Sequence, residues 1–132
     1  MYRAGFKVLM LGIESTSDES LKLLNKGFTV REIREAFKVL RRFNFIYHGF
    51  FIIGNVGESE DDMLYISKFA REIGVDALSL SRLRVEKYSP LRDLILNSNG
   101  YHIANNMKKN TMSLYPIRAL YRIWVAVSPT NQ

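Results

Sequence analysis

Short apolar runs alternate with longer amphipathic stretches through most of this chain. The apolar runs cover residues 8–12, 45–53 and 75–83, and each has the length of a buried β-strand. Between the strands, residues 30–43 and 63–73 carry apolar side chains every three or four positions, which predicts helices with one buried face. Strands that alternate with amphipathic helices are typical of a parallel sheet joined by right-handed crossovers.

Polar residues and glycines at the predicted helix ends support these boundaries. Ser15–Glu19 offers N-cap candidates for a first short helix, and Gly27 is its predicted left-handed stop. Thr29 opens a capping box for the second helix. Ser59 precedes an acidic first turn that suits the positive end of a helix dipole, and Gly74 ends that third helix.

The pattern is less regular beyond residue 83. Ser89-Pro90 predicts the start of a short helix, residues 97–110 are polar and predict a loop, and Tyr115-Pro116 predicts a last helix. We expect residues 1–96 to form one α/β domain, with the loop and C-terminal helix of residues 97–132 packed on it. Strands that are apolar on both faces suit a barrel or a doubly wound sheet, but three strands alone leave two edges open.

The length and composition of the chain exclude several classes of protein. The 132 residues suffice for one domain with a substantial core. No apolar stretch is long enough for a transmembrane helix and the N-terminus lacks a signal-peptide layout, so we expect a cytoplasmic protein without a membrane partner. The absence of cysteine excludes disulfides, a cysteine nucleophile and a cysteine-ligated metal centre within this chain, and two histidines argue against a histidine-rich metal site.

The net charge of +6 is compatible with a nucleic acid or phosphate partner but does not require one. A basic stripe follows helical spacing along the second predicted helix and consists of Arg31, Arg34, Lys38 and Arg41. Glutamates interrupt this stripe, which favours a solvated outer face over an RNA-binding surface.

Polar or glycine-rich segments follow all three strands, at residues 12–15, 54–58 and 81–84. In parallel α/β folds these carboxyl ends meet at the functional edge of the sheet. Glu14 is either a solvated acid beside a helix cap or an acceptor for ligand hydroxyls, and Lys26 has the same two interpretations as a helix-end cation. The Gly54–Gly57 segment is either a plain strand-to-helix turn or a site of close ligand approach. His48, inside a strand, is expected to be a hydrogen-bonded core or bottom-face residue.

Several short motifs, in this order, resemble the second half of a radical S-adenosylmethionine (radical SAM) barrel. They span about residues 1–95 and are Ala4-Gly5-Phe6, Gly12-Ile13-Glu14-Ser15, Leu24-Asn25-Lys26-Gly27, His48–Gly54 and Gly57-Glu58-Ser59. The closest likeness is to the group often fused to a cobalamin-binding domain, which includes magnesium-protoporphyrin monomethyl ester oxidative cyclase-like proteins.

The resemblance implies half of a TIM-like partial barrel and a cofactor-binding role for five residues. Glu14, with Ser15 beside it, corresponds to the polar end of the family's fourth strand, which binds the cofactor ribose. Lys26 falls where relatives carry a basic residue facing the cofactor carboxylate. The segment from Gly54 to Glu58 resembles the fifth-strand motif beside the adenine.

The family's three-cysteine loop and first three strands are missing, so this chain cannot ligate the [4Fe-4S] cluster of such an enzyme. Asn55-Val56 also replaces the usual Leu-Pro, and Lys26 stands where relatives often have Arg. We therefore expect a fragment that forms the ribose and adenine side of an S-adenosylmethionine site, has no catalytic residue of its own and is inert alone. Its expected partners are the missing half-barrel or a second copy joined through open sheet edges. The alternative is a non-enzymatic RNA-binding or assembly module.

Overall fold

A computed structural model describes residues 1–86, 88–97, 102–106 and 111–115. The chain opens with a 3-10 turn, η1 (Tyr2–Ala4), and then alternates strands and helices: β1 (Val8–Glu14), α1 (Asp18–Leu23), α2 (Val30–Leu40), β2 (Ile46–Ile53), α3 (Glu60–Ile73) and β3 (Ala77–Arg82). β4 (Arg84–Glu86), α4 (Leu91–Leu96), β5 (His102–Asn106) and β6 (Thr111–Tyr115) follow.

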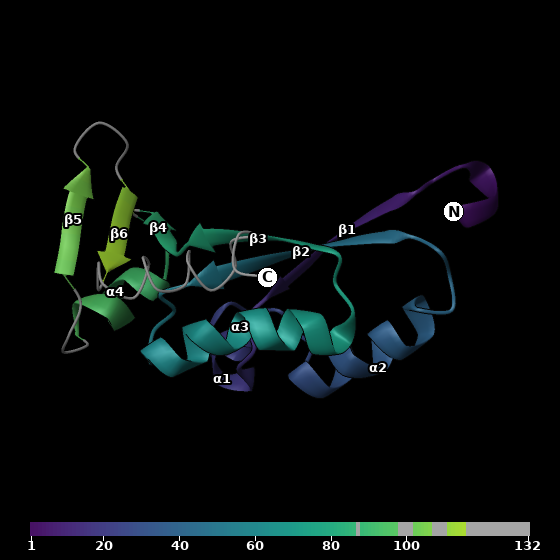
Figure 1. The fold of residues 1–132 in the computed structure, drawn as a ribbon. Helices are drawn as coiled ribbons and strands as arrows, with labels where there is room; N and C mark the ends of the chain where they lie inside the picture. Colours follow the sequence, from purple (N-terminus) through teal and green to yellow (C-terminus); the bar gives the residue numbers. More distant parts are fainter. Residues whose placement is uncertain (87, 98–101, 107–110, 116–132) are drawn as a thin grey trace, which may run out of the picture.

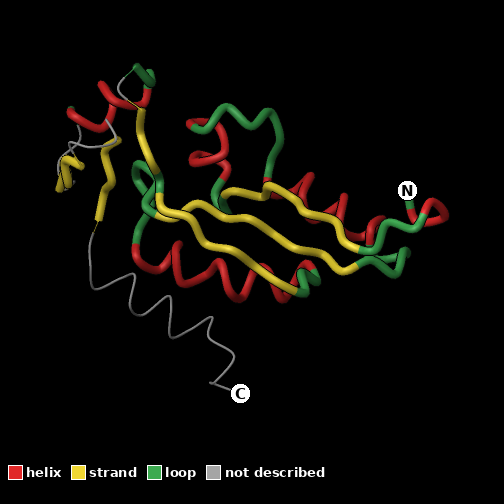
Figure 2. Tube along the Cα trace, turned by 90° about the horizontal axis from the view of Figure 1, so that it is seen from above, coloured by secondary structure: helices red, strands yellow, loops and turns green. Residues whose placement is uncertain are grey.

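The main sheet has the order β1-β2-β3, and both neighbouring pairs are parallel. The predicted α/β class with three parallel core strands and flanking helices is therefore confirmed. Figure 1 shows α1, α2 and α3 on the same side of this sheet, and Figure 2 shows the three strands side by side from above. β1 and β3 form the two edges of the sheet.

The hydrophobic core lies between these helices and one face of the sheet. β2 shows why, because its burial alternates strictly along the strand, with Tyr47, Phe51 and Ile53 buried on the helix side. α3 contributes the apolar stripe that its sequence predicts, consisting of Met63, Ile66, Phe69, Ala70 and Ile73.

The helix caps follow the sequence closely. Thr29 and Ser59 each form a complete capping box, with Glu32 and Asp62 respectively. Gly74 ends α3 in the left-handed conformation, with a φ of 86°. The first helix ends at Leu23, and the chain after it is left-handed at the predicted Gly27, with a φ of 66°, and also at Asn25.

The opposite face of the main sheet carries no helix among the described residues. Its apolar side chains are correspondingly exposed, at 65% for Met10, 53% for Ile46 and 47% for Val8. We call this the open face. His48 lies on it, half-buried, near the amino end of β2; it is not in the core, but it forms the hydrogen bond that the sequence analysis expects.

A second sheet, with the antiparallel order β4-β6-β5, stands beyond the carboxyl ends of β2 and β3 (Figure 1). The loop predicted over residues 97–110 is therefore wrong at residues 102–106, which form β5. Tyr115, the predicted start of the last helix, ends β6, and the rest of that predicted helix lies outside the described residues. The strands were missed because the ladder partners, not local β-propensity, decide the conformation of such polar segments.

Candidate functional site

The carboxyl ends of the three parallel strands lie side by side, as the sequence predicts. Ladder pairs join Glu14 to Phe51 across β1 and β2, and Ile52 to Ser81 across β2 and β3. The chain segments that follow these strands therefore lie together at the carboxyl ends of the strands. This carboxyl end of the sheet is the candidate site, and its most unusual residue is Glu14.

Glu14 has a left-handed backbone conformation, with a φ of 71°. The regular pairing of β1 with β2 shifts between Gly12 and Glu14, so a bulge accompanies this conformation. A non-glycine residue in the left-handed region carries a conformational cost of roughly 1–2 kcal/mol. Such strain is often kept where it aims a functional side chain.

The Glu14 carboxylate folds back over Gly12 on the open face. A Cβ atom added to Gly12 would lie 2.7 Å from Glu14 Oε1, closer than carbon and oxygen normally approach. Gly12 itself belongs to the open face, since it is paired with Phe50 and alternates with Leu11 and Ile13. Because Gly12 has no side chain, it leaves space for the Glu14 carboxylate.

Lys26 is the ionic partner of Glu14. Its Nζ donates a hydrogen bond to Glu14 Oε1 at 2.9 Å, and the side chains remain 32% exposed for Lys26 and 16% for Glu14. Lys26 follows α1, and its backbone N–H donates to the carbonyl of Leu21, which fixes the segment beside β1. The structure therefore brings two predicted site residues into direct contact. Glu14 Oε2 has no hydrogen bond with any described residue.

Ser15 is fully buried, and its Oγ accepts a hydrogen bond from the Ser17 N–H at 3.1 Å. Ser17 in turn caps α1, where its side chain accepts from the Ser20 N–H. The Ser15 hydroxyl thus supports the turn into α1. It has no exposed surface in this structure through which to touch a ligand.

The loop from β2 to α3 is closed by Glu58. Its Oε2 accepts hydrogen bonds from the backbone N–H groups of Gly54 at 2.6 Å and Asn55 at 3.0 Å. Burial raises the pKa of Glu58 above its usual range, while these amide hydrogen bonds act in the opposite direction. Gly54 has a φ of 79°, which a glycine adopts without strain. Two further predicted site residues, Gly54 and Glu58, therefore contact each other.

His48 forms its expected hydrogen bond on the open face, with a partner, Ser79, that the sequence analysis did not identify. His48 Nε2 lies 2.8 Å from Ser79 Oγ, and the imidazole stacks on the Phe50 ring with centroids 4.8 Å apart. The two-residue alternation of β2 could have placed His48 and Phe50 on one face. The partner Ser79 depends on the ladder between β2 and β3, which one strand alone does not reveal.

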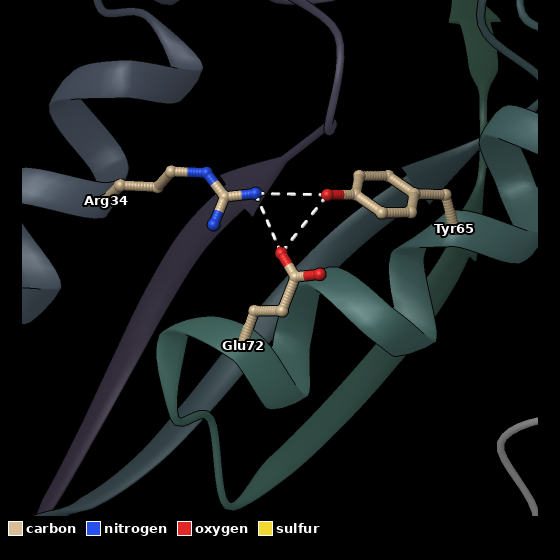
Figure 3. A network of polar contacts seen from close by, with 3 residues as sticks. All are labelled: Arg34, Tyr65 and Glu72. Carbon is tan, nitrogen blue, oxygen red and sulfur yellow. Dashed lines mark hydrogen bonds and ion pairs between the residues drawn. The ribbon is translucent and has the colours of Figure 1, made fainter.

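The basic stripe lies on the outer surface, and acids bind two of its four cations. Arg34 donates to Glu72 at 2.8 Å and to the Tyr65 hydroxyl at 3.0 Å, so it links α2 to α3 (Figure 3). Lys38 pairs with Glu35 at 2.7 Å. Internal pairing of this kind fits a solvated helix face.

Two further observations concern the described part of the chain alone. It contains no group of three or more histidine, cysteine, aspartate or glutamate side chains arranged to hold a metal ion. None of its helices is long and apolar enough to cross a bilayer.

The chain is similar to a protein from Pyrococcus horikoshii whose name is "Uncharacterized methyltransferase PH0819". The two are 29% identical over 105 residues, which covers 75% of this chain but 23% of the relative. The chain therefore spans about a quarter of the length of that curated relative. No protein-family model matches the chain.

Proposed function

We propose that this chain is one half of a parallel strand–helix barrel in a radical SAM enzyme, and that it forms the ribose and adenine side of an S-adenosylmethionine site. The arrangement of Glu14 over Gly12, paired with Lys26, carries this proposal. A carboxylate on a strained backbone at a strand end, with one oxygen on a lysine and the other without a hydrogen bond from any described residue, is well suited to accept hydrogen bonds from a pair of ligand hydroxyls.

The one-sided sheet supports the barrel part of the proposal. In a barrel of this type the helices cover the outside and the other face of the sheet lines the interior. β1, β2 and β3 have helices on one face, while exposed apolar residues occupy the other, among them Met10 and Ile46. Glu14 lies at the carboxyl end of this face, where such barrels place their ligands.

The distant relative supports the choice of cofactor. Its name describes a methyltransferase, and S-adenosylmethionine is the general methyl donor of that class of enzyme. The matched share of the relative also agrees with a chain that supplies one part of a larger site.

The donor set at the strand ends fits the cofactor's polar groups. The Glu14 carboxylate would accept from the ribose hydroxyls, and the Lys26 ammonium would attract the cofactor carboxylate as a point charge. The backbone at Gly54 would lie by the adenine, while Glu58 holds that loop in place and Ser15 holds the turn into α1. When bound to a reduced iron–sulfur cluster, the cofactor supplies the radical chemistry of such enzymes.

The cluster itself needs thiolate ligands, and this chain has no cysteine. We therefore propose that the chain alone is catalytically inert and that a second half-barrel, with the cluster, docks against the open face and the β1 edge. A second copy of this chain is the other candidate for that surface.

Equilibrium dialysis with radiolabelled S-adenosylmethionine tests the binding role. The chain should retain the label, and Glu14→Gln and Lys26→Met should each lower retention. Lys38→Met is the matched control, because Lys38 also pairs with a glutamate but lies on the outer face of α2. Equal retention by all four proteins, or none by the parent chain, would contradict the proposal.

Reconstitution tests the claim of inertness separately. After anaerobic addition of iron, sulfide, a reductant and S-adenosylmethionine, we expect neither cluster absorbance nor 5′-deoxyadenosine. Either signal would overturn the claim that this chain alone is inactive.

A further inference from the structure

A cavity of about 600 Å³ opens beside the carboxyl end of β3, apart from the Glu14–Lys26 pair. Its lining includes residues of β3, β4 and α4. Aliphatic side chains from three further segments line one part of it, including Leu24 after α1, Ile52 of β2 and Leu91 of α4. Its polar lining comes from Ser81, Arg82 and Arg84.

The segment of residues 82–84 contributes both charged and apolar lining to the cavity. Leu83 and Val85 are 5% and 1% exposed and pack with Ile95 in a second apolar cluster. Arg82, Leu83 and Arg84 all line the cavity. Leu24, Ile52 and Leu91 pack against the Leu83 cluster and also line the cavity, so this cluster forms its apolar wall. The Leu83 N–H donates to the Ile53 carbonyl at 2.9 Å, which fixes this register against β2.

The lining of the cavity is basic. None of the described residues that line it is acidic, and Arg84 forms no ion pair or hydrogen bond with a described side chain. This differs from the basic stripe of α2, where Glu72 and Glu35 bind Arg34 and Lys38. A guanidinium group in the lining of a partly apolar cavity attracts an anion, and its planar fork matches carboxylate and phosphate oxygens.

We infer that this cavity binds a ligand with an aliphatic body and an anionic head group, a carboxylate or a phosphate. The aliphatic side chains take up the body, and Arg84, with Arg82 beside it, binds the head. This assignment involves none of the residues assigned to the cofactor, so either proposal can fail without the other.

Octanoate is a suitable probe, with binding followed by NMR of ¹³C-labelled Leu and Ile methyl groups. We expect shifts centred on Leu24, Ile52 and Leu91, and an affinity that Arg84→Gln lowers roughly tenfold or more, since a charge-assisted hydrogen bond is lost. Arg84→Lys should retain part of the affinity. Arg42→Gln is the matched control, because Arg42 is exposed and does not line the cavity.

Further ligands test the role of the anionic head group and the separation of this cavity from the cofactor site. Octanol should bind more weakly than octanoate and without dependence on Arg84, while octyl phosphate that binds more tightly than octanoate would identify phosphate as the preferred head. Octanoate binding that survives Arg84→Gln in a folded protein, or shifts centred elsewhere, would overturn the proposal. Displacement of octanoate by S-adenosylmethionine would also overturn it, because the cavity would then be part of the cofactor site.

Discussion

The backbone of Glu14 has an unfavourable conformation, and this same conformation determines where its carboxylate lies. Its left-handed φ of 71° is unfavourable for glutamate, yet this conformation folds the carboxylate over Gly12 and onto Lys26. Asparagine tolerates the left-handed region far better than glutamine or glutamate does, and the chain itself uses Asn25 in that conformation. Glu14 is therefore the residue at which function and stability should conflict.

We predict that Glu14→Asn is more stable than Glu14→Gln by up to about 1 kcal/mol, because only asparagine relieves the left-handed strain. Both variants lose the Lys26 ion pair, so this loss cancels in the comparison. Urea denaturation of the two variants measures the difference. Equal stabilities would show that the conformation of residue 14 carries no strain.

Glu14, Gly54 and Glu58 could be selected from the sequence, since each belongs to a strand end or to the segment that follows it. Lys26 could be selected as a cation after a helix, at a position where the family resemblance implies a basic residue. The contacts among them could not be predicted. The Glu14–Lys26 pair depends on the bulge in β1, and the role of Glu58 depends on a loop that turns the Gly54 and Asn55 amides inward. Ser15 was chosen as a neighbour of Glu14, and its burial follows from the turn into α1.

At the scale of elements, Glu58 in the loop before α3 and Asp62 in the first turn of α3 have opposite effects on stability. Burial raises the pKa of Glu58, so the folded state favours its protonated form and this group costs stability as the pH rises. Hydrogen bonds from the Ser59 side chain and backbone lower the pKa of Asp62, so Asp62 adds stability that is lost as the pH falls.

The matched variants Glu58→Gln and Asp62→Asn should therefore diverge with pH. Relative to the parent chain, Glu58→Gln should gain stability as the pH rises above about 4, where an ordinary glutamate ionises. Asp62→Asn should be destabilised at neutral pH, and this deficit should shrink below about pH 4. Urea midpoints from about pH 3 to about pH 7 measure both trends. Parallel pH profiles for the two variants would contradict the assigned environments.

The elements differ in how well the sequence predicted them. β1, β2 and β3 are continuous apolar runs, and α3 has a clear helical periodicity with a cap at each end; the limits of all four agree with the prediction to within a few residues. β4, β5 and β6 are short, and their pairing in a separate antiparallel sheet joins segments with no recognisable pattern of their own. Periodicity reveals an element that buries one face, but not one whose conformation depends on its neighbours.

At the scale of the whole molecule, the open face is the surface that the proposed half-barrel leaves uncovered. The helices bury one side of the main sheet, and the other side exposes Met10, Ile46 and Val8 beside the edge strand β1. Exposed apolar residues next to an open strand edge favour association. The tendency to associate follows from the proposed half-barrel, whether a second half-barrel or a second copy of this chain covers the open face.

We predict that the isolated chain self-associates with increasing concentration and that Met10→Asp weakens this association, because it places a charge on the open face at the β1 edge. Val39→Asp is the control, since Val39 is 53% exposed on α2, on the helical side of the sheet. Sedimentation velocity over a concentration series measures the effect. A monomer at all concentrations, or equal weakening by both variants, would remove the open face as the docking surface.

The central claim is that Glu14 binds the hydroxyls of a nucleoside at the carboxyl edge of the sheet. The most direct measurement is an NMR titration of the ¹⁵N-labelled chain with adenosine and, separately, with 2′,3′-dideoxyadenosine. The account predicts that adenosine shifts the amide signals of Gly12, Glu14 and Gly54, and that removal of the two hydroxyls or the change Glu14→Gln abolishes most of this response. Identical responses to both nucleosides, or shifts confined to other parts of the chain, would contradict it.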